Sequence, residues 1–96
     1  MKKIVFISST YEDLIGGVDV ETTKLNVSGY SAWKTKIVFT NYNSSTVTVY
    51  YEIKNANNDT LTGSKVLKPN ESKTIVDGGD YNYITGVEVK TITRKL

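Results

Sequence analysis

The feature that most constrains the fold is the alternation of apolar and polar residues over positions 46–54. Side chains of a β-strand point in turn to two opposite faces, so this pattern predicts a strand with one face on a core and the other in water. The core face would carry Val47, Val49, Tyr51 and Ile53. Tyr50 is the aromatic exception on the polar face, where it either pairs across the sheet or marks a contact surface.

Segments of similar character recur along the chain and are separated by residues that favour turns. The predicted strands are 3–10, 18–27, 33–40, 46–54, 60–67, 72–77 and 84–93. We expect the strands 33–40 and 46–54 to form a hairpin through the link 41–45. Residues 11–15 could make one helical turn at most, and no longer helical period is present.

Seven short strands with regular turn signals predict an all-β fold, and specifically a two-sheet immunoglobulin-like sandwich of about seven antiparallel strands. Residues rich in Ile, Val and Tyr favour strands, because branched and aromatic side chains pack well on a pleated surface. A chain of 96 residues has room for one core. We therefore expect a single domain over residues 1–96.

From residue 36 to about residue 91 the chain resembles bacterial Ig-like modules of the CARDB and FxLYD kind. The resemblance rests on the strand end and Ser-rich turn 39–45, the alternating strand 47–53, the Asn-rich turn 55–59 and the Leu-Lys-Pro-Asn-Glu-Ser corner 67–72. Asn70 stands where these modules usually have Gly, and Asn tolerates the left-handed conformation well. The resemblance implies a role in adhesion, assembly or display, and no catalytic residue.

The chain contains neither His nor Cys. Ser-His-Asp and Cys-His catalysis and thiolate or imidazole zinc sites are therefore excluded. A carboxylate pair for glycoside hydrolysis would need a cleft for which so small a sandwich has little room. We expect a protein that is not an enzyme and uses no cofactor.

In a sandwich of seven strands that run up and down in turn, alternate loops lie at the same end. The loops 28–32, 55–59 and 77–83 would therefore share one end. That end is our candidate binding site, with Tyr30, Asn55, Asn57, Asp59, Asp77, Asp80, Tyr81 and Tyr83. Aromatic rings beside amides and carboxylates suit either sugar stacking or a protein contact. The opposite end offers a second possible docking site, with Tyr11, Glu12, Asp13, Tyr42, Asn43 and Lys68.

Two of these groups also have other interpretations. The alternate spacing of Asn55, Asn57 and Asp59 is shared with calcium loops, but a hairpin turn explains it as well. The segment from Asp77 to Tyr81 is similar to the tyrosine corner of immunoglobulin domains, in which the Tyr is structural. Trp33 and Tyr51 are predicted to be core residues.

The net charge of +2 is spread along the chain, with a local basic excess only at Lys90, Arg94 and Lys95. We interpret these three residues as a solvated edge strand or tail, and expect no nucleic-acid partner. No apolar run is long enough for a membrane span, and the apolar start ends at Ile7 without the features of a signal peptide. A cytoplasmic or virion-associated protein is expected, unless the sequence is a mature secreted fragment.

Frequent Lys, Asn, Ile and Tyr codons point to an AT-rich bacterium or its phage. The leading hypothesis is a non-enzymatic module that binds a protein partner. The alternatives are a carbohydrate-binding module that uses Tyr30, Tyr81 and Tyr83, and a shell or tail component that associates with itself through edge strands.

Overall fold

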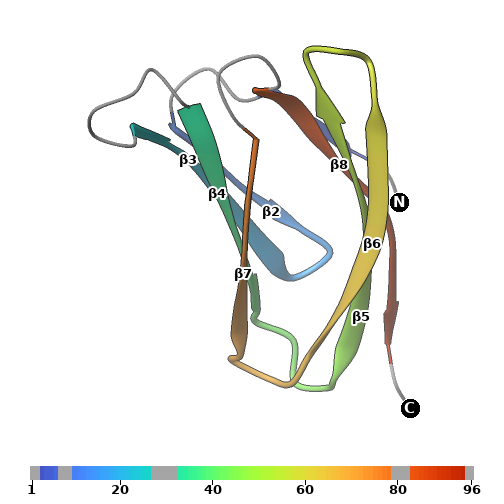
Figure 1. Cartoon of the computed structure of the whole chain (residues 1–96). Helices are drawn as coiled ribbons and strands as arrows, with labels where there is room; N and C mark the ends of the chain where they lie inside the picture. Colours follow the sequence, from blue (N-terminus) through green and yellow to red (C-terminus); the bar gives the residue numbers. More distant parts are fainter. Residues whose placement is uncertain (1–2, 7–9, 27–32, 79–82, 95–96) are drawn as a thin grey trace.

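In the residues that the structure describes, the chain forms two antiparallel sheets of four strands each, facing one another (Figure 1). The computed structural model describes residues 3–6, 10–26, 33–78 and 83–94. Within them lie β1 (Lys3–Phe6), β2 (Thr10–Ile15), β3 (Val18–Asn26), β4 (Trp33–Asn41), β5 (Val47–Asn55), β6 (Thr60–Leu67), β7 (Ser72–Asp77) and β8 (Ile84–Arg94). The predicted all-β, two-sheet fold is confirmed, with eight strands in place of about seven and no helix in the described residues.

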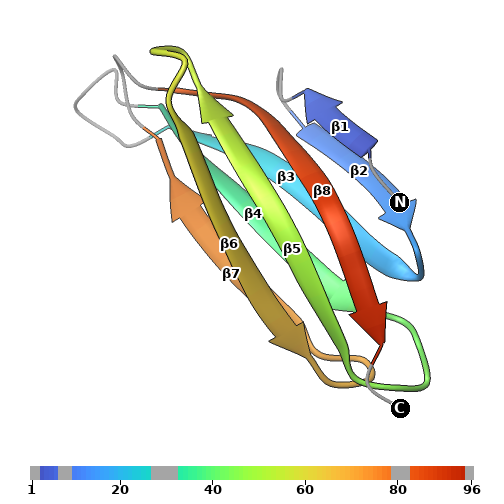
Figure 2. The same cartoon turned by 90° about the vertical axis from the view of Figure 1, so that its right-hand side faces the viewer.

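One sheet has the strand order β1-β8-β5-β6 and the other has the order β2-β3-β4-β7. Figure 2 views the first sheet from its outer side, with β5 between β6 and β8. The core between the sheets contains Val18, Val20, Ile37, Phe39, Val47, Val49, Tyr51, Ile53, Leu67, Ile84, Val87 and Val89. The predicted inward face of β5 and the burial of Tyr51 are thereby confirmed, whereas the Trp33 side chain lies outside the described part.

The N-terminal strand prediction was wrong. Residues 3–10 are not one strand, because β1 pairs with β8 in one sheet and β2 pairs with β3 in the other. Residues 11–15, for which one helical turn at most was expected, belong to β2. The turn Gly16-Gly17 joins β2 to β3 in a hairpin. Its φ values of 57° and 77° suit the two-residue hairpin turn that glycines favour, and the turn places Ile15 opposite Val18.

The predicted hairpin between the strands now called β4 and β5 is also wrong. β4 pairs with β3 and β7, whereas β5 pairs with β6 and β8 in the opposite sheet. Residues 42–46 therefore cross between the sheets. Each strand has an apolar face to bury, and both faces are buried when the strands lie opposite each other across the core. Alternation alone does not distinguish this arrangement from side-by-side pairing in one sheet.

Asn41 holds this crossing in place, although its side chain is fully buried. Its Nδ2 donates to the carbonyl oxygens of Ser45 and Leu67, at 2.9 and 3.0 Å. Its Oδ1 accepts from the backbone and side-chain nitrogens of Asn43. Its backbone N–H donates to the Glu71 carbonyl and its carbonyl accepts from Asn70 N–H. Asn41 thus joins the β4–β5 link to the end of β6 through its side chain, and to the β6–β7 link through its backbone.

The β6–β7 link is stabilised by its own residues. Glu71 Oε1 accepts from Lys68 N–H at 2.9 Å, and Glu71 N–H donates to the Lys68 carbonyl. Asn70 has a φ of 64°, which confirms the left-handed conformation predicted for it. The segments of the Ser-rich turn and of the Pro-Asn-Glu-Ser corner therefore meet at one end of the sandwich.

Two irregularities in β8 explain why its apolar residues do not alternate. The register against β5 shifts between Tyr50 and Tyr51 and again between Lys54 and Asn55, which leaves Lys90 and Thr85 as extra residues in β8. Each extra residue lengthens the apolar repeat locally from two to three. Ile84, Val87, Val89 and Ile92 consequently all face the core.

Candidate functional site: the outer face of β6, β5 and β8

The outward side chains of three neighbouring strands form one surface, which we call the β6–β5–β8 face. On β5 these are the residues that alternate with the core positions, and strand register places their neighbours beside them. The face comprises Thr60, Thr62, Ser64 and Val66 of β6, Thr48, Tyr50, Glu52 and Lys54 of β5, and Gly86, Glu88, Lys90, Thr91 and Thr93 of β8. It combines a row of hydroxyl groups with one aromatic ring and one charged cluster.

Tyr50 is the aromatic ring of this face, and 43% of it is exposed. It lies opposite Ser64 on β6 and opposite Thr91 on β8. Val66, one position along β6 on the same face, is 50% exposed. Tyr50 and Val66 thus present apolar area to solvent, set among hydroxyl groups, as contact surfaces commonly do.

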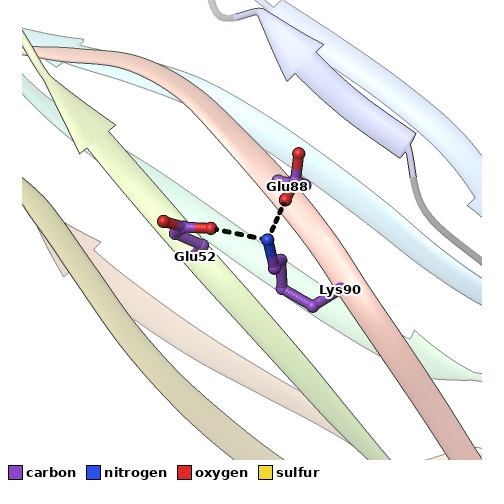
Figure 3. Close-up of polar contacts among 3 residues, drawn as sticks. All are labelled: Glu52, Glu88 and Lys90. Carbon is purple, nitrogen blue, oxygen red and sulfur yellow. Dashed lines mark ion pairs between the residues drawn. The ribbon is translucent and has the colours of Figure 1, made fainter.

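The charged cluster lies beside Tyr50, where Lys90 joins two carboxylates (Figure 3). Its Nζ is 2.7 Å from Glu88 Oε1 and 3.1 Å from Glu52 Oε2. Glu52 and Glu88 are directly opposite in the β5–β8 pairing, an arrangement that would be repulsive without a cation. Lys90 reaches both carboxylates because it is the extra residue of the β8 bulge, at the point where the register against β5 shifts.

Glu88 is nearly buried, at 6% exposure, although it points away from the core. β8 is flanked at this level by β5 on one side and by β1 on the other, with Ile4 opposite Glu88. A carboxylate withdrawn from water requires a charged or hydrogen-bonding partner. Accordingly, the bonds from Glu88 first and Glu52 second raise the pKa of Lys90 above its ordinary value. Lys90 is therefore an ion-paired cation whose side chain remains 39% exposed.

At one end of the face lies an open hollow of about 220 Å³, lined by Lys54, Asn55, Asn58, Thr60 and Thr85. Its walls offer an ammonium group, amides and hydroxyls. Thr85 Oγ1 donates to the Lys54 carbonyl at 3.3 Å, which joins the bulge of β8 to β5. The hollow can accept a small polar group by hydrogen bonding.

The turn 55–59 beside the hollow is organised by Asn55. Its Oδ1 accepts from the backbone N–H groups of Asn57 and Asp59, both at 3.0 Å. Its backbone N–H donates to the Asp59 carbonyl, and its carbonyl accepts from Asn58 N–H. Asn58 has a φ of 63°. The hairpin-turn interpretation therefore accounts for the spacing of Asn55, Asn57 and Asp59, because the Asn55 side-chain oxygen accepts hydrogen bonds within the turn.

The predicted loop-end site is thus brought together in part. The Tyr83 carbonyl accepts from Ala56 N–H at 2.9 Å, so Tyr83, 44% exposed, adjoins the 55–59 turn. Asp77 belongs to the opposite sheet, accepts from Gly78 N–H, and acts electrostatically on the core residue Tyr51. Tyr30, Asp80 and Tyr81 lie outside the described residues, and so does the tyrosine-corner hypothesis.

The described residues offer neither a metal-binding cluster nor a membrane-spanning helix. These residues contain no group of three or more His, Cys, Asp and Glu side chains close enough to share a metal ion. None of their segments forms a helix with the length and apolar character of a membrane span.

Sequence analysis missed most of this face. Tyr50 was identified from its place in the alternation, and Asn55 of the hollow was among the candidate site residues. The cluster of Glu52, Glu88 and Lys90 and the other hollow residues were not identified. The interrupted alternation of residues 84–92 does indicate bulges in this strand. It does not show which strand pairs with it. Register across the sheet is what joins Glu52 to Glu88.

Comparison with known proteins identifies no relative: no protein-family model, no curated protein and no solved structure matches the chain. The likeness to bacterial Ig-like modules therefore stays a prediction.

Proposed function

We propose that this chain is an immunoglobulin-like module that binds a protein partner through the β6–β5–β8 face. The strand pairing and the crossing at Asn41 support the immunoglobulin-like assignment. β4 pairs with β7 and β5 pairs with β8, as strands B and E and strands C and F do in immunoglobulin domains. The crossing held by Asn41 joins the same segments on which the sequence resemblance rests.

The observation that carries the function is Tyr50. An aromatic side chain that is 43% exposed in the middle of a sheet face, with exposed Val66 beside it, is the kind of residue that contributes most to protein interfaces. The surrounding hydroxyl groups provide hydrogen bonds, and the Glu52–Lys90–Glu88 cluster provides charges of both signs. A binding module needs no further chemistry.

The experiment is affinity capture from extracts of the source cells, with the purified chain as bait. Tyr50→Ala should weaken binding to the captured protein by about 30-fold, the effect of losing an interface hot spot. The matched control is Val76→Ala, because Val76 is 51% exposed in the other sheet. A partner bound equally by both variants, or no partner in native extracts, would refute this proposal.

A second candidate function is favoured by the hollow at the end of the face. Tyr83 adjoins the 55–59 turn, and Asn55 and Asn58 of this turn line the hollow with Lys54, Thr60 and Thr85. A Tyr ring near amides, hydroxyls and one ammonium group suits a sugar ring stacked on Tyr and bonded through its hydroxyls. On a glycan array, Tyr83→Ala and Thr60→Ala should then abolish the signal while Tyr50→Ala retains it. An array with no signal rejects this candidate.

A further inference from the structure

β6 forms one edge of its sheet and is the longest of the four edge strands in the described residues (Figure 2). Within this part of the chain it pairs with β5 alone, in an unbroken register from Thr60 to Leu67. Natural edge strands are protected from further pairing by shortness, charge, proline or a bulge. β6 has one charged residue in eight, whereas β7, at the edge of the other sheet, has two in six. β6 is therefore the edge most open to another strand.

Both sides of this edge expose an apolar side chain. Leu61 lies on the core side, opposite Ile53, but is 53% exposed because no described strand lies beyond β6. Val66, on the outer side, is 50% exposed. An added strand would cover apolar area on both sides while its backbone bonds to the open edge of β6. The edge therefore suits an extended strand and not a compact ligand.

The side chains of the edge complement those of an identical strand. When a second β6 runs antiparallel to the first, with Gly63 facing Gly63, each Leu61 lies opposite Lys65 of the other copy. The aliphatic stem of Lys65 then covers Leu61, as long basic side chains do on apolar surfaces. Its ammonium group lies diagonally from Asp59 of that other copy, an exposed carboxylate two residues before Leu61. The register thus pairs opposite charges and keeps the two lysines apart.

We propose that two copies of the chain associate by antiparallel pairing of their β6 strands, in the register centred on Gly63. The pairing joins two sheets of four strands into one continuous sheet and closes a two-fold dimer. The dimer uses the edge of β6, whereas the proposed function depends on Tyr50 in the outer face. Tyr50→Ala should therefore leave dimerisation unchanged, and the two proposals can fail independently.

Sedimentation velocity over a range of protein concentrations measures the dimer. Thr62 of one copy lies opposite Ser64 of the other in this register, so Thr62→Lys/Ser64→Lys sets lysine opposite lysine at two places. The dissociation constant of the dimer should rise about tenfold. The matched control is Thr74→Lys/Val76→Lys, which adds the same charge at exposed positions of the edge strand β7 and should leave the dimer intact.

A charge exchange separates lost pairing from lost folding. Thr62→Glu/Ser64→Glu should also weaken its own dimer, but when it is mixed with Thr62→Lys/Ser64→Lys the two should form a heterodimer. A natural chain that sediments as a monomer at every concentration, or equal dissociation constants for the Lys variants of β6 and β7, would overturn the proposal. So would a mixture that remains monomeric although circular dichroism shows that both variants have folded.

Cysteines test the register, because the chain has none of its own. On oxidation, a mixture of Thr62→Cys and Ser64→Cys should give mainly the disulfide-linked heterodimer, since directly opposite residues are the closest across the axis. The mass of each linked product identifies it. If Ser64→Cys links mainly to itself, the register centred on Gly63 is wrong.

Discussion

The ring of Tyr51 occupies the space directly above Gly63, its partner on the neighbouring strand. A Cβ atom on Gly63 would lie 2.5 Å from the Tyr51 hydroxyl oxygen and 2.7 Å from Cζ. The same ring stacks on Phe39 of the opposite sheet, with centroids 5.5 Å apart and an interplanar angle of 30°. The missing side chain at Gly63 therefore lets one aromatic residue cover its own sheet and contact the other.

Gly63→Ala is expected to destabilise the fold by about 1–3 kcal/mol, because the new methyl group must displace a packed ring. Urea unfolding measures the loss. Ser64→Ala, at the exposed neighbouring position, should change stability by less than about 0.5 kcal/mol. A smaller residue at position 51 should remove the conflict, so Gly63→Ala should cost less in a Tyr51→Val background. Additive effects would contradict the contact.

Asn41→Ala is expected to cost about 2–4 kcal/mol, since it removes four side-chain hydrogen bonds and leaves buried carbonyl groups without donors. Thermal and urea unfolding measure it. Asn57→Ala is the matched control, because the Asn57 side chain is exposed in a turn. If the two variants are equally stable, the links between the sheets do not depend on Asn41.

Lys90→Met should lower the melting temperature, because Glu52 and Glu88 then face one another without their shared cation. Adding Glu52→Gln to Lys90→Met should recover part of the loss by removing one of the two like charges. Lys65→Met supplies a lysine control in the same sheet, because Lys65 lies opposite Val49 and not opposite a carboxylate. Failure of Glu52→Gln to help would mean that repulsion across β5 and β8 is unimportant.

Stability should fall at alkaline pH, and Tyr51 should account for part of the fall. Burial first, and the charge of Asp77 second, raise the pKa of Tyr51 above its ordinary 10.0. The unfolded chain therefore loses this proton first, so the contribution is complete below about pH 10 and declines above it. Lys90 acts in the same direction above its ordinary pKa of 10.5, because its pKa is also raised.

Urea unfolding from pH 8 to pH 11 tests this linkage. Tyr51→Phe keeps the ring but has no ionisable group, so its free energy of unfolding should decline less steeply above pH 10 than that of the natural chain. Tyr42→Phe is the control, because Tyr42 is 62% exposed. Identical slopes for all three proteins would show that Tyr51 ionises as readily in the fold as in the unfolded chain.

Local sequence determined most of the strands, the inward face of β5 and several turns. Alternation at 46–54 identified the core face of β5, because side-chain direction in a strand has a period of two whatever its neighbours are. Gly16-Gly17 and Asn70 occupy the left-handed conformations that their residue types tolerate. The absence of His and Cys is likewise a property of the sequence alone.

The tertiary structure decided which strands are neighbours. Alternation does not specify a partner, so β4 and β5 looked like a hairpin although they lie in opposite sheets, and the buried Asn41 fixes that crossing. The β6–β5–β8 face has the same origin: Glu52 and Glu88 are far apart in sequence and meet through register, which depends on two bulges in β8. Pairing is a long-range property, since it is set by the burial of both sheets at once.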